Sequence, residues 1–112
     1  MNILFVCTMN VARSVTAERL YRNTAGMRVR SAGVSPRARR RVSAADVEWA
    51  DKIVTFEPGH LVELKRRFGE EIAARVLDVD IDDAFAAGSP DLESAVRDSL
   101  VDVLGPPGRA AR

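Results

Sequence analysis

A cysteine and an arginine near the start of the chain have the spacing of a loop that handles phosphate. Five residues separate Cys7 from Arg13: Thr8, Met9, Asn10, Val11 and Ala12. A loop of this length can curl so that successive backbone N–H groups converge on one tetrahedral anion, and a helix N-terminus adds unpaired amides. Arg13 can hold two oxygens of the same phosphate through its guanidinium fork. The same positive field stabilises a thiolate, so Cys7 can attack phosphorus and hold the phosphoryl group.

The alternative for Cys7 is a small buried apolar residue, which is the commonest role of a lone cysteine. A bare spacing of this kind also arises by chance. Its position favours the phosphate loop, because a strand pattern precedes Cys7 and a helix pattern follows it, with Ser14 next to Arg13.

Apolar runs of strand length alternate with helical patterns along the chain. Strands are predicted over 2–6, 27–30, 52–56 and 75–79, and helices over 14–24, 43–50, 58–68 and 90–104. The run at 27–30 alternates apolar and basic residues, as expected of a half-exposed edge strand. This order predicts an α/β fold of three layers, α/β/α, with a small parallel sheet of about four strands. Ligands of such sheets bind beyond the carboxyl ends of the strands, where Cys7 would lie.

Composition excludes several classes of protein. The chain has 112 residues, a net charge of +1 and one cysteine, which rules out disulfide scaffolds and makes zinc modules implausible. No apolar run approaches a membrane span, and no secretory leader is recognised, so we expect a cytoplasmic protein without membrane or nucleic-acid partners. We expect one domain over 1–104, a flexible tail over 105–112, a monomer, and no cofactor or metal.

Four segments occur in the order of a known family. They are 6–18 (VCTMNVARSVTAE), 31–33 (SAG), 50–55 (ADKIVT) and 80–85 (DIDDAF). Together they resemble the low-molecular-weight protein tyrosine phosphatases, in particular a short bacterial branch, over roughly 1–104. The resemblance implies that Cys7 is the nucleophile and Arg13 the phosphate clamp. It also implies that Asn10 holds the loop by hydrogen bonds and that Ser14 donates to the thiolate.

The resemblance also implies a general acid on a later loop. Family members carry an aspartate, a proline and an aromatic residue there, and the matching positions are Asp83, Ala84 and Phe85. An acid of this kind protonates the leaving group and then activates water. Asp82 is the reserve candidate, and a solvated acidic loop is the alternative for both. The substrate-binding set comprises Thr8, Met9, Asn10, Val11, Ala12, Ser14 and Phe85. Val11 and Phe85 suit a flat aromatic ester.

The chain departs from the family pattern at several positions. Met9 replaces a glycine that permits unusual backbone angles, so we expect a strained or reshaped loop. Ala12 stands where many relatives have a second cysteine, Val15 replaces a proline, and Ala84 replaces the proline after the acid. The segment 34–49 is shorter than usual and contains four arginines, Arg37, Arg39, Arg40 and Arg41. These either steer phosphorylated proteins toward the site or form a solvated basic loop.

Several functions remain open from the sequence. The first is hydrolysis of phosphotyrosine proteins or aryl phosphates through a phosphocysteine. An arsenate reductase that uses an external thiol would share the loop and the thiolate attack. Phosphoarginine hydrolysis is disfavoured by the apolar Val11. A phosphate-binding regulatory module with decayed catalysis is the alternative outside enzymology. His60 is expected to be structural or to lie at the surface.

Overall fold

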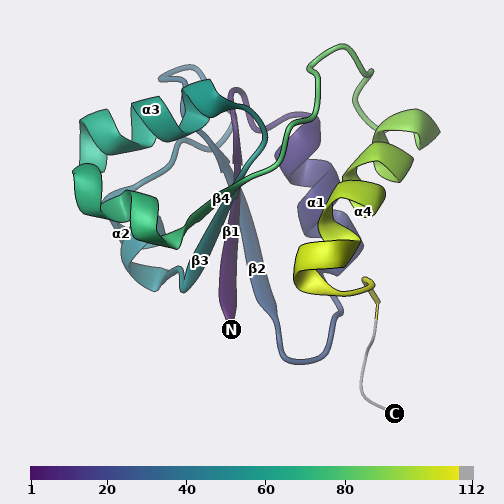
Figure 1. The fold of residues 1–112 in the computed structure, drawn as a ribbon. Helices are drawn as coiled ribbons and strands as arrows, with labels where there is room; N and C mark the ends of the chain where they lie inside the picture. The colour runs from purple at the N-terminus through teal and green to yellow at the C-terminus, as the bar shows by residue number, and fades with distance from the viewer. Residues whose placement is uncertain (109–112) are drawn as a thin grey trace.

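The protein is built on a central sheet of four parallel strands. The computed structural model describes residues 1–108 and places the strands in the order β2-β1-β3-β4 (Figure 1). The strands are β1 (Asn2–Cys7), β2 (Arg28–Gly33), β3 (Lys52–Thr55) and β4 (Val76–Asp78). β1 and β3 occupy the centre and are almost wholly buried, as continuous apolar runs predict for strands covered on both faces. The predicted α/β class and four-stranded parallel sheet are confirmed.

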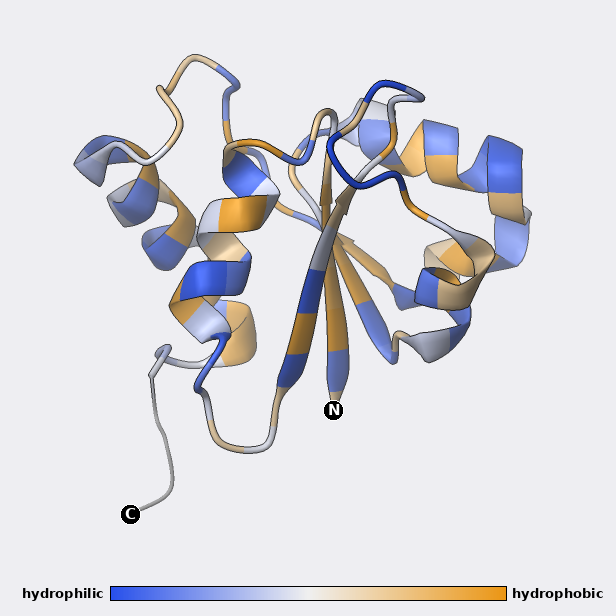
Figure 2. Cartoon of the chain, turned by 180° about the vertical axis from the view of Figure 1, so that it is seen from behind, coloured by the Kyte–Doolittle hydropathy of each residue, from blue (hydrophilic) through white to orange (hydrophobic). Residues whose placement is uncertain are grey.

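Helices cover both faces of the sheet and make the three layers. On one face, α1 (Arg13–Tyr21) and α4 (Pro90–Leu104) pack against Ile3, Phe5 and Cys7 of β1. On the other face, α2 (Ala44–Trp49), α3 (Pro58–Phe68) and the 3-10 helix η1 (Glu70–Arg75) cover Leu4 and Val6. Figure 2 shows the apolar strands between these two layers. Alternate residues of β1 therefore serve two separate core clusters.

Local sequence signals explain where the helices begin. Ser43 caps α2 in a capping box: its side chain accepts from the backbone of Asp46, whose carboxylate accepts from the backbone of Ser43. Pro58 and Pro90 stand in the first turns of α3 and α4, where a missing N–H costs nothing. These two helices have the bounds that the apolar periodicity predicts.

Three elements differ from the sequence prediction. Helix α1 ends at Tyr21, before the predicted end at 24. The edge strand β2 continues through Ser31, Ala32 and Gly33, because these residues pair in parallel with the end of β1, up to Cys7 opposite Gly33. The 3-10 helix η1 was not predicted, since a single buried residue, Ile72, anchors it and leaves no apolar period to recognise. The extension of β2 matters for the site, because it brings the segment after Gly33 alongside the loop after Cys7.

The described part of the C-terminus is attached to the body of the protein. The Tyr21 hydroxyl donates to the carbonyl of Gly105 at 2.7 Å, and the N–H of Gly108 donates to Thr24 Oγ1 at 2.9 Å. The remainder of the predicted flexible tail, 109–112, lies outside the described residues. Within residues 1–108, no helix has the length and apolar character needed to cross a membrane.

Gly33 is required where the segment after β2 meets the loop after β1. A Cβ at this position would lie 2.5 Å from the carbonyl oxygen of Thr8 and 2.9 Å from the backbone nitrogen of Asn10. We expect Gly33→Ala to destabilise the protein by about 1–3 kcal/mol, because backbone atoms cannot move aside as a side chain can. Urea unfolding measures this. Gly59→Ala is the control, since the nearest atom to its new Cβ is a carboxylate oxygen at 3.8 Å. Equal stabilities of the two variants would contradict the prediction.

Candidate active site

The loop between β1 and α1 is held by hydrogen bonds to its carbonyl groups. Four successive carbonyl oxygens accept from the segment that follows β2, beginning with Cys7 and ending with Asn10. The donors are, in order, the backbone N–H groups of Val34 (2.9 Å), Ser35 (3.0 Å) and Arg39 (3.0 Å), and Nε–H of Arg39 (3.0 Å). In a planar trans peptide the carbonyl and the following N–H point in opposite directions. The N–H groups of residues 8–11 are therefore turned away from that segment.

A hollow of about 370 Å³ lies beside this loop and the start of α1. Its lining residues are Cys7, Thr8, Met9, Val11, Ala12, Arg13, Asp83 and Ala87. The first amides of α1 have no partners within the helix and add a positive dipole end. The loop amides, the N-terminus of α1 and the Arg13 guanidinium can together bind one tetrahedral anion, as the spacing of Cys7 and Arg13 predicts.

The unusual backbone angle of the loop falls on Asn10. Asn10 has φ of +57°, the one positive value among the non-glycine residues that the structure describes. Asparagine tolerates this left-handed conformation better than most residues. Met9 has an ordinary φ, and its side chain is 39% exposed. Replacement of the expected glycine by Met9 therefore causes no strain of this kind, contrary to our expectation from the sequence.

A buried hydrogen-bond chain ends on the thiol of Cys7. Ser14 Oγ lies 2.8 Å from Cys7 Sγ and accepts from Asn10 Nδ2 at 3.0 Å. Because its oxygen accepts from Asn10, the Ser14 hydroxyl has its own proton free for the sulfur. A donor at this distance stabilises a thiolate more than a thiol, since only the thiolate is a strong acceptor.

The guanidinium of Arg13 is fixed by two carboxylates and a carbonyl. Its NH1 donates to Glu57 Oε1 at 2.8 Å and to the carbonyl of Ile81 at 3.0 Å, and its NH2 lies 3.5 Å from Asp83 Oδ1. The hydrogen bond from Arg13 lowers the pKa of Glu57 below its ordinary value. Sequence reasoning missed Glu57, because an acidic residue directly before a helix is common and nothing local connects it to Arg13.

The two candidate acids occupy different positions. Asp83 lines the hollow that contains Cys7 and forms the ion pair with Arg13. Asp82 lines a neighbouring, more open hollow of about 610 Å³, together with Thr8, Glu57, Asp80, Ile81 and Asp83. Of the two carboxylates, only that of Asp83 borders both hollows. This geometry favours Asp83 over Asp82 for proton transfer at the phosphate site.

His60 is buried behind the loop and binds Thr8. The backbone N–H of Phe56 donates to His60 Nδ1 at 3.1 Å, so in the neutral ring the proton is on Nε2, which lies 3.0 Å from Thr8 Oγ1. Burial lowers the pKa of His60 from 6.5 to about 4. A neutral His60 therefore donates to Thr8 and leaves the Thr8 hydroxyl proton free. The structural role expected of His60 agrees with this position.

The remaining predicted residues are placed as follows. Thr8, Met9, Val11 and Ala12 line the hollow, whereas Asn10 and Ser14 are fully buried behind it and hold the loop. Phe85 is not among the lining residues, in contrast to its predicted place at the substrate: it is partly buried against the core cluster on the α1 and α4 face of the sheet, and Ala87 lines the hollow.

The basic segment is not simply a solvated or steering loop. Arg39 binds Asn10, and Arg40 donates to the carbonyl of Ser31 at 2.7 Å and pairs with the buried Asp46. Two of the four arginines thus have structural partners inside the protein.

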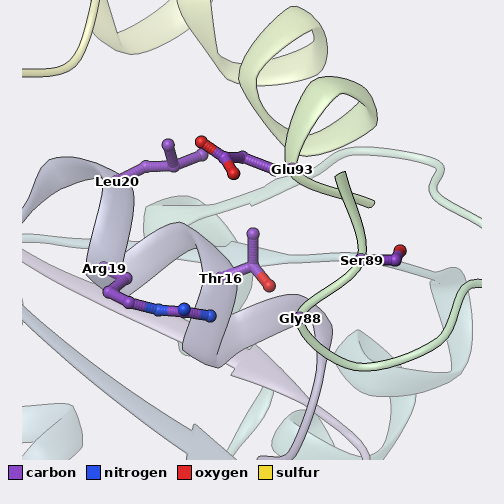
Figure 3. A pocket seen from close by; sticks show the side chains of 6 residues that line it. All are labelled: Thr16, Arg19, Leu20, Gly88, Ser89 and Glu93. Carbon is purple, nitrogen blue, oxygen red and sulfur yellow. The ribbon is translucent and has the colours of Figure 1, made fainter. Parts of the chain in front are cut away.

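A further hollow of about 200 Å³ lies between α1 and the start of α4 (Figure 3). Its lining residues are Thr16, Arg19, Leu20, Gly88, Ser89 and Glu93. These residues include no nucleophilic thiol and no histidine, and Arg19 and Glu93 carry opposite charges. The arrangement around Cys7 therefore remains the candidate active site.

Comparison with known proteins supports the chemistry of this site. Residues 2–48 match the model of the family described as low molecular weight phosphotyrosine protein phosphatase. No curated protein sequence matches the chain. The YwlE arginine phosphatase from Geobacillus stearothermophilus is 26% identical, with 88% of this chain and 84% of that chain covered and a TM-score of 0.69.

Two further solved structures cover nearly the whole chain. A low molecular weight protein tyrosine phosphatase from Bacillus subtilis, solved in solution, is 25% identical, covers 94% of this chain and 93% of its own, and has a TM-score of 0.73. A YwlE arginine phosphatase whose active-site cysteine is replaced by a phosphorylated serine is 26% identical, with coverages of 94% and 91% and a TM-score of 0.71.

Fold and site define a cysteine-dependent phosphatase. Within that class, the first part of the chain matches the low molecular weight phosphotyrosine protein phosphatase family model, and its fold is similar to that of such phosphatases over nearly its whole length.

The low pKa of His60 predicts a loss of stability in acid. The unfolded chain binds a proton near pH 6.5 and the folded chain only near pH 4, so the unfolded state holds more protons between these values. The stabilising effect is complete above pH 6.5 and declines as the pH falls toward 4. We expect His60 to account for about 2 kcal/mol of the stability lost between pH 7 and pH 4.5.

Urea unfolding of the wild type and of His60→Asn at several pH values measures this contribution. Other carboxylates also weaken the fold in acid, so the difference in slope between the two proteins is the informative quantity. The variant should be less stable at pH 7 and should show a shallower decline. Parallel stability curves would contradict a neutral, buried His60.

Proposed function

We propose that this chain hydrolyses aryl phosphate monoesters, with phosphotyrosine in proteins as the natural class of substrate. Cys7 is the nucleophile, Arg13 the phosphate clamp and Asp83 the general acid. The observation that carries the proposal is the position of Cys7 beside the loop amides, with the Ser14 hydroxyl 2.8 Å from its sulfur and both Arg13 and Asp83 in the same hollow.

The first step transfers the phosphoryl group to the enzyme. The thiolate of Cys7 attacks phosphorus, a sulfur–phosphorus bond forms, and the bond from phosphorus to the leaving oxygen breaks. Asp83 gives its proton to that oxygen, so a phenol departs instead of a phenolate. The loop amides and Arg13 hold the three oxygens whose charge changes in the transition state, and Glu57 keeps the guanidinium in place.

The second step returns the enzyme to its starting state. Asp83, now a carboxylate, accepts a proton from a water molecule that attacks phosphorus from the side the phenol has left. The sulfur–phosphorus bond breaks, inorganic phosphate forms, and Cys7 leaves as a thiolate. The Ser14 hydroxyl stabilises that thiolate as a leaving group in the same way as it stabilises the nucleophile.

The rim of the hollow supports an aromatic leaving group. The side chains of Met9 and Val11 are 39% and 52% exposed, and Ala12 and Ala87 complete the apolar lining. An aryl ring that enters above the phosphate covers this apolar surface, whereas a small polar ester leaves it in water.

Phosphoarginine is the second candidate substrate. A cationic guanidinium leaving group would meet the carboxylates of Glu57, Asp80 and Asp82 in the neighbouring hollow. The similarity to proteins described as arginine phosphatases supports this candidate, and the apolar Val11 opposes it. Arsenate reduction is not favoured, because the similar proteins are phosphatases.

The cellular context follows from the same chemistry. Substrates are phosphate esters or phosphoproteins, and Cys7 must stay reduced to react, which favours the cytoplasm. We propose a single catalytic domain over 1–104 that acts as a monomer.

Steady-state hydrolysis of p-nitrophenyl phosphate, phosphotyrosine and phosphoarginine by reduced protein tests the assignment. We expect Cys7→Ser to abolish turnover. Asp83→Asn should lower kcat by roughly 10²–10⁴-fold for phosphotyrosine and less for p-nitrophenyl phosphate, because a good leaving group needs less protonation. Asp82→Asn is the matched control and should stay within a few fold of wild type.

A trapping experiment tests the intermediate. Acid quench of Asp83→Asn during turnover should show one added phosphoryl group on the peptide that contains Cys7. Loss of activity in Asp82→Asn but not in Asp83→Asn would reverse the two roles. Faster turnover of phosphoarginine than of phosphotyrosine would replace the leading substrate with the second candidate. If the protein binds phosphate but turns over none of these substrates, the proposal that it is a phosphatase is contradicted.

A further inference from the structure

Arg39 lies in the basic segment between β2 and α2 and makes a two-point contact with Asn10. Its Nε–H donates to the Asn10 carbonyl and its NH2 donates to Asn10 Oδ1, both at 3.0 Å. Its own backbone N–H donates to the carbonyl of Met9 at 3.0 Å. Arg39 thus binds the loop at three points, although the residue is exposed.

The guanidinium decides which way the Asn10 amide faces. Arginine has donors only, so the amide atom that it contacts must be the oxygen. The amide nitrogen is then turned toward Ser14 Oγ, at 3.0 Å, and must act as donor there. Ser14 has accepted one hydrogen bond and keeps its proton for Cys7 Sγ, at 2.8 Å. Arg39 therefore fixes Asn10 as the donor to Ser14, and the Ser14 proton is available to the sulfur of Cys7.

Asn10 also needs a restraint on its backbone. Its φ of +57° lies in the left-handed region, which costs a non-glycine residue free energy. The fork of Arg39 grips the carbonyl and the side chain of this one residue, which opposes a return to an ordinary φ.

We propose that Arg39 is a positioning residue for Cys7: through Asn10 and Ser14 it directs a hydroxyl proton at the sulfur and so stabilises the thiolate with which Cys7 reacts. It acts without contact to the substrate. The inference rests on the proposed function for its consequence in catalysis, but the state of the thiol can be measured without any substrate.

Other charged or titratable groups also face the loop. They are Arg13 in α1, Glu57 before α3, His60 in α3, and Asp80, Asp82 and Asp83 after β4. The charge of Arg39 adds to their field, so a test must separate the hydrogen-bond chain from a plain effect of charge.

The pH dependence of Cys7 alkylation by iodoacetamide is the first measurement, because the thiolate is the species that reacts. We expect Arg39→Met to move the midpoint to higher pH and to slow alkylation at neutral pH roughly tenfold or more, the effect of losing one hydrogen bond to a charged group. Arg39→Lys keeps the positive charge but loses the two-point contact, so its alkylation midpoint and rate should fall between those of the wild type and Arg39→Met. Arg37→Met is the matched control, removes a charge from the same segment, and should follow the wild type.

A double-mutant cycle with Ser14→Ala identifies the route. If Arg39 acts through Ser14, then Arg39→Met should change alkylation little in the Ser14→Ala background. An equal effect in both backgrounds would overturn the proposal and indicate an effect of the Arg39 charge alone. Wild-type alkylation in Arg39→Met would also overturn it, because Arg39 would then have no influence on the thiol. If Arg39→Met does not fold, Arg39→Lys and Arg39→Gln give the same comparison.

The pH profile of kcat/KM for p-nitrophenyl phosphate then connects the thiol to catalysis. Its acidic limb should move upward in Arg39→Lys together with the alkylation midpoint. If the alkylation midpoint shifts in the Arg39 variants but the protein hydrolyses no phosphate ester, the positioning role is supported and the proposed function is refuted. If the protein hydrolyses phosphate esters but the alkylation profile is unchanged in every Arg39 variant, the proposed function is supported and the positioning role is refuted.

Discussion

The site depends on one constraint: the loop after β1 must satisfy its carbonyl groups without using its N–H groups. Buried backbone polar groups need partners, and a phosphate can pair only with the donors. The segment after β2 supplies the donors for four successive carbonyls, from Cys7 to Asn10, and so leaves the opposite side of each peptide for an anion. The close approach at Gly33 and the left-handed Asn10 both follow from this arrangement.

Parallel pairing explains why that segment is in place. Gly33 ends β2 directly opposite Cys7 at the end of β1, so the segments that follow these two strands leave the sheet at the same edge and at the same level. β3 lies on the other side of β1, and the turn after it brings Glu57 to Arg13. The loop with Arg13, the segment that holds the loop and the carboxylate of Glu57 therefore follow three neighbouring strand ends, at the edge where α/β sheets usually bind ligands.

The sequence predicts the parts of this site that are local. Apolar runs and helix caps specify β1, α3 and α4 because each depends on residues close in the chain. The spacing of Cys7 and Arg13 predicts the loop for the same reason. The contacts of Arg39 and Glu57 could not be predicted, since they join residues 29 and 44 positions apart from segments without periodicity. A strained or reshaped loop was expected at Met9, where relatives have glycine, whereas the left-handed backbone conformation falls on Asn10.

The charges around the site are divided between two tasks. Basic side chains behind the loop, Arg39 and Arg40, hold protein groups, so they are not all free to attract substrate. At the front, Glu57 and Asp83 offset the charge of Arg13 when no anion is bound. A phosphate bound beside Arg13 would supply the negative charge that these two carboxylates supply in its absence, so the buried guanidinium has an anionic partner with or without a bound anion.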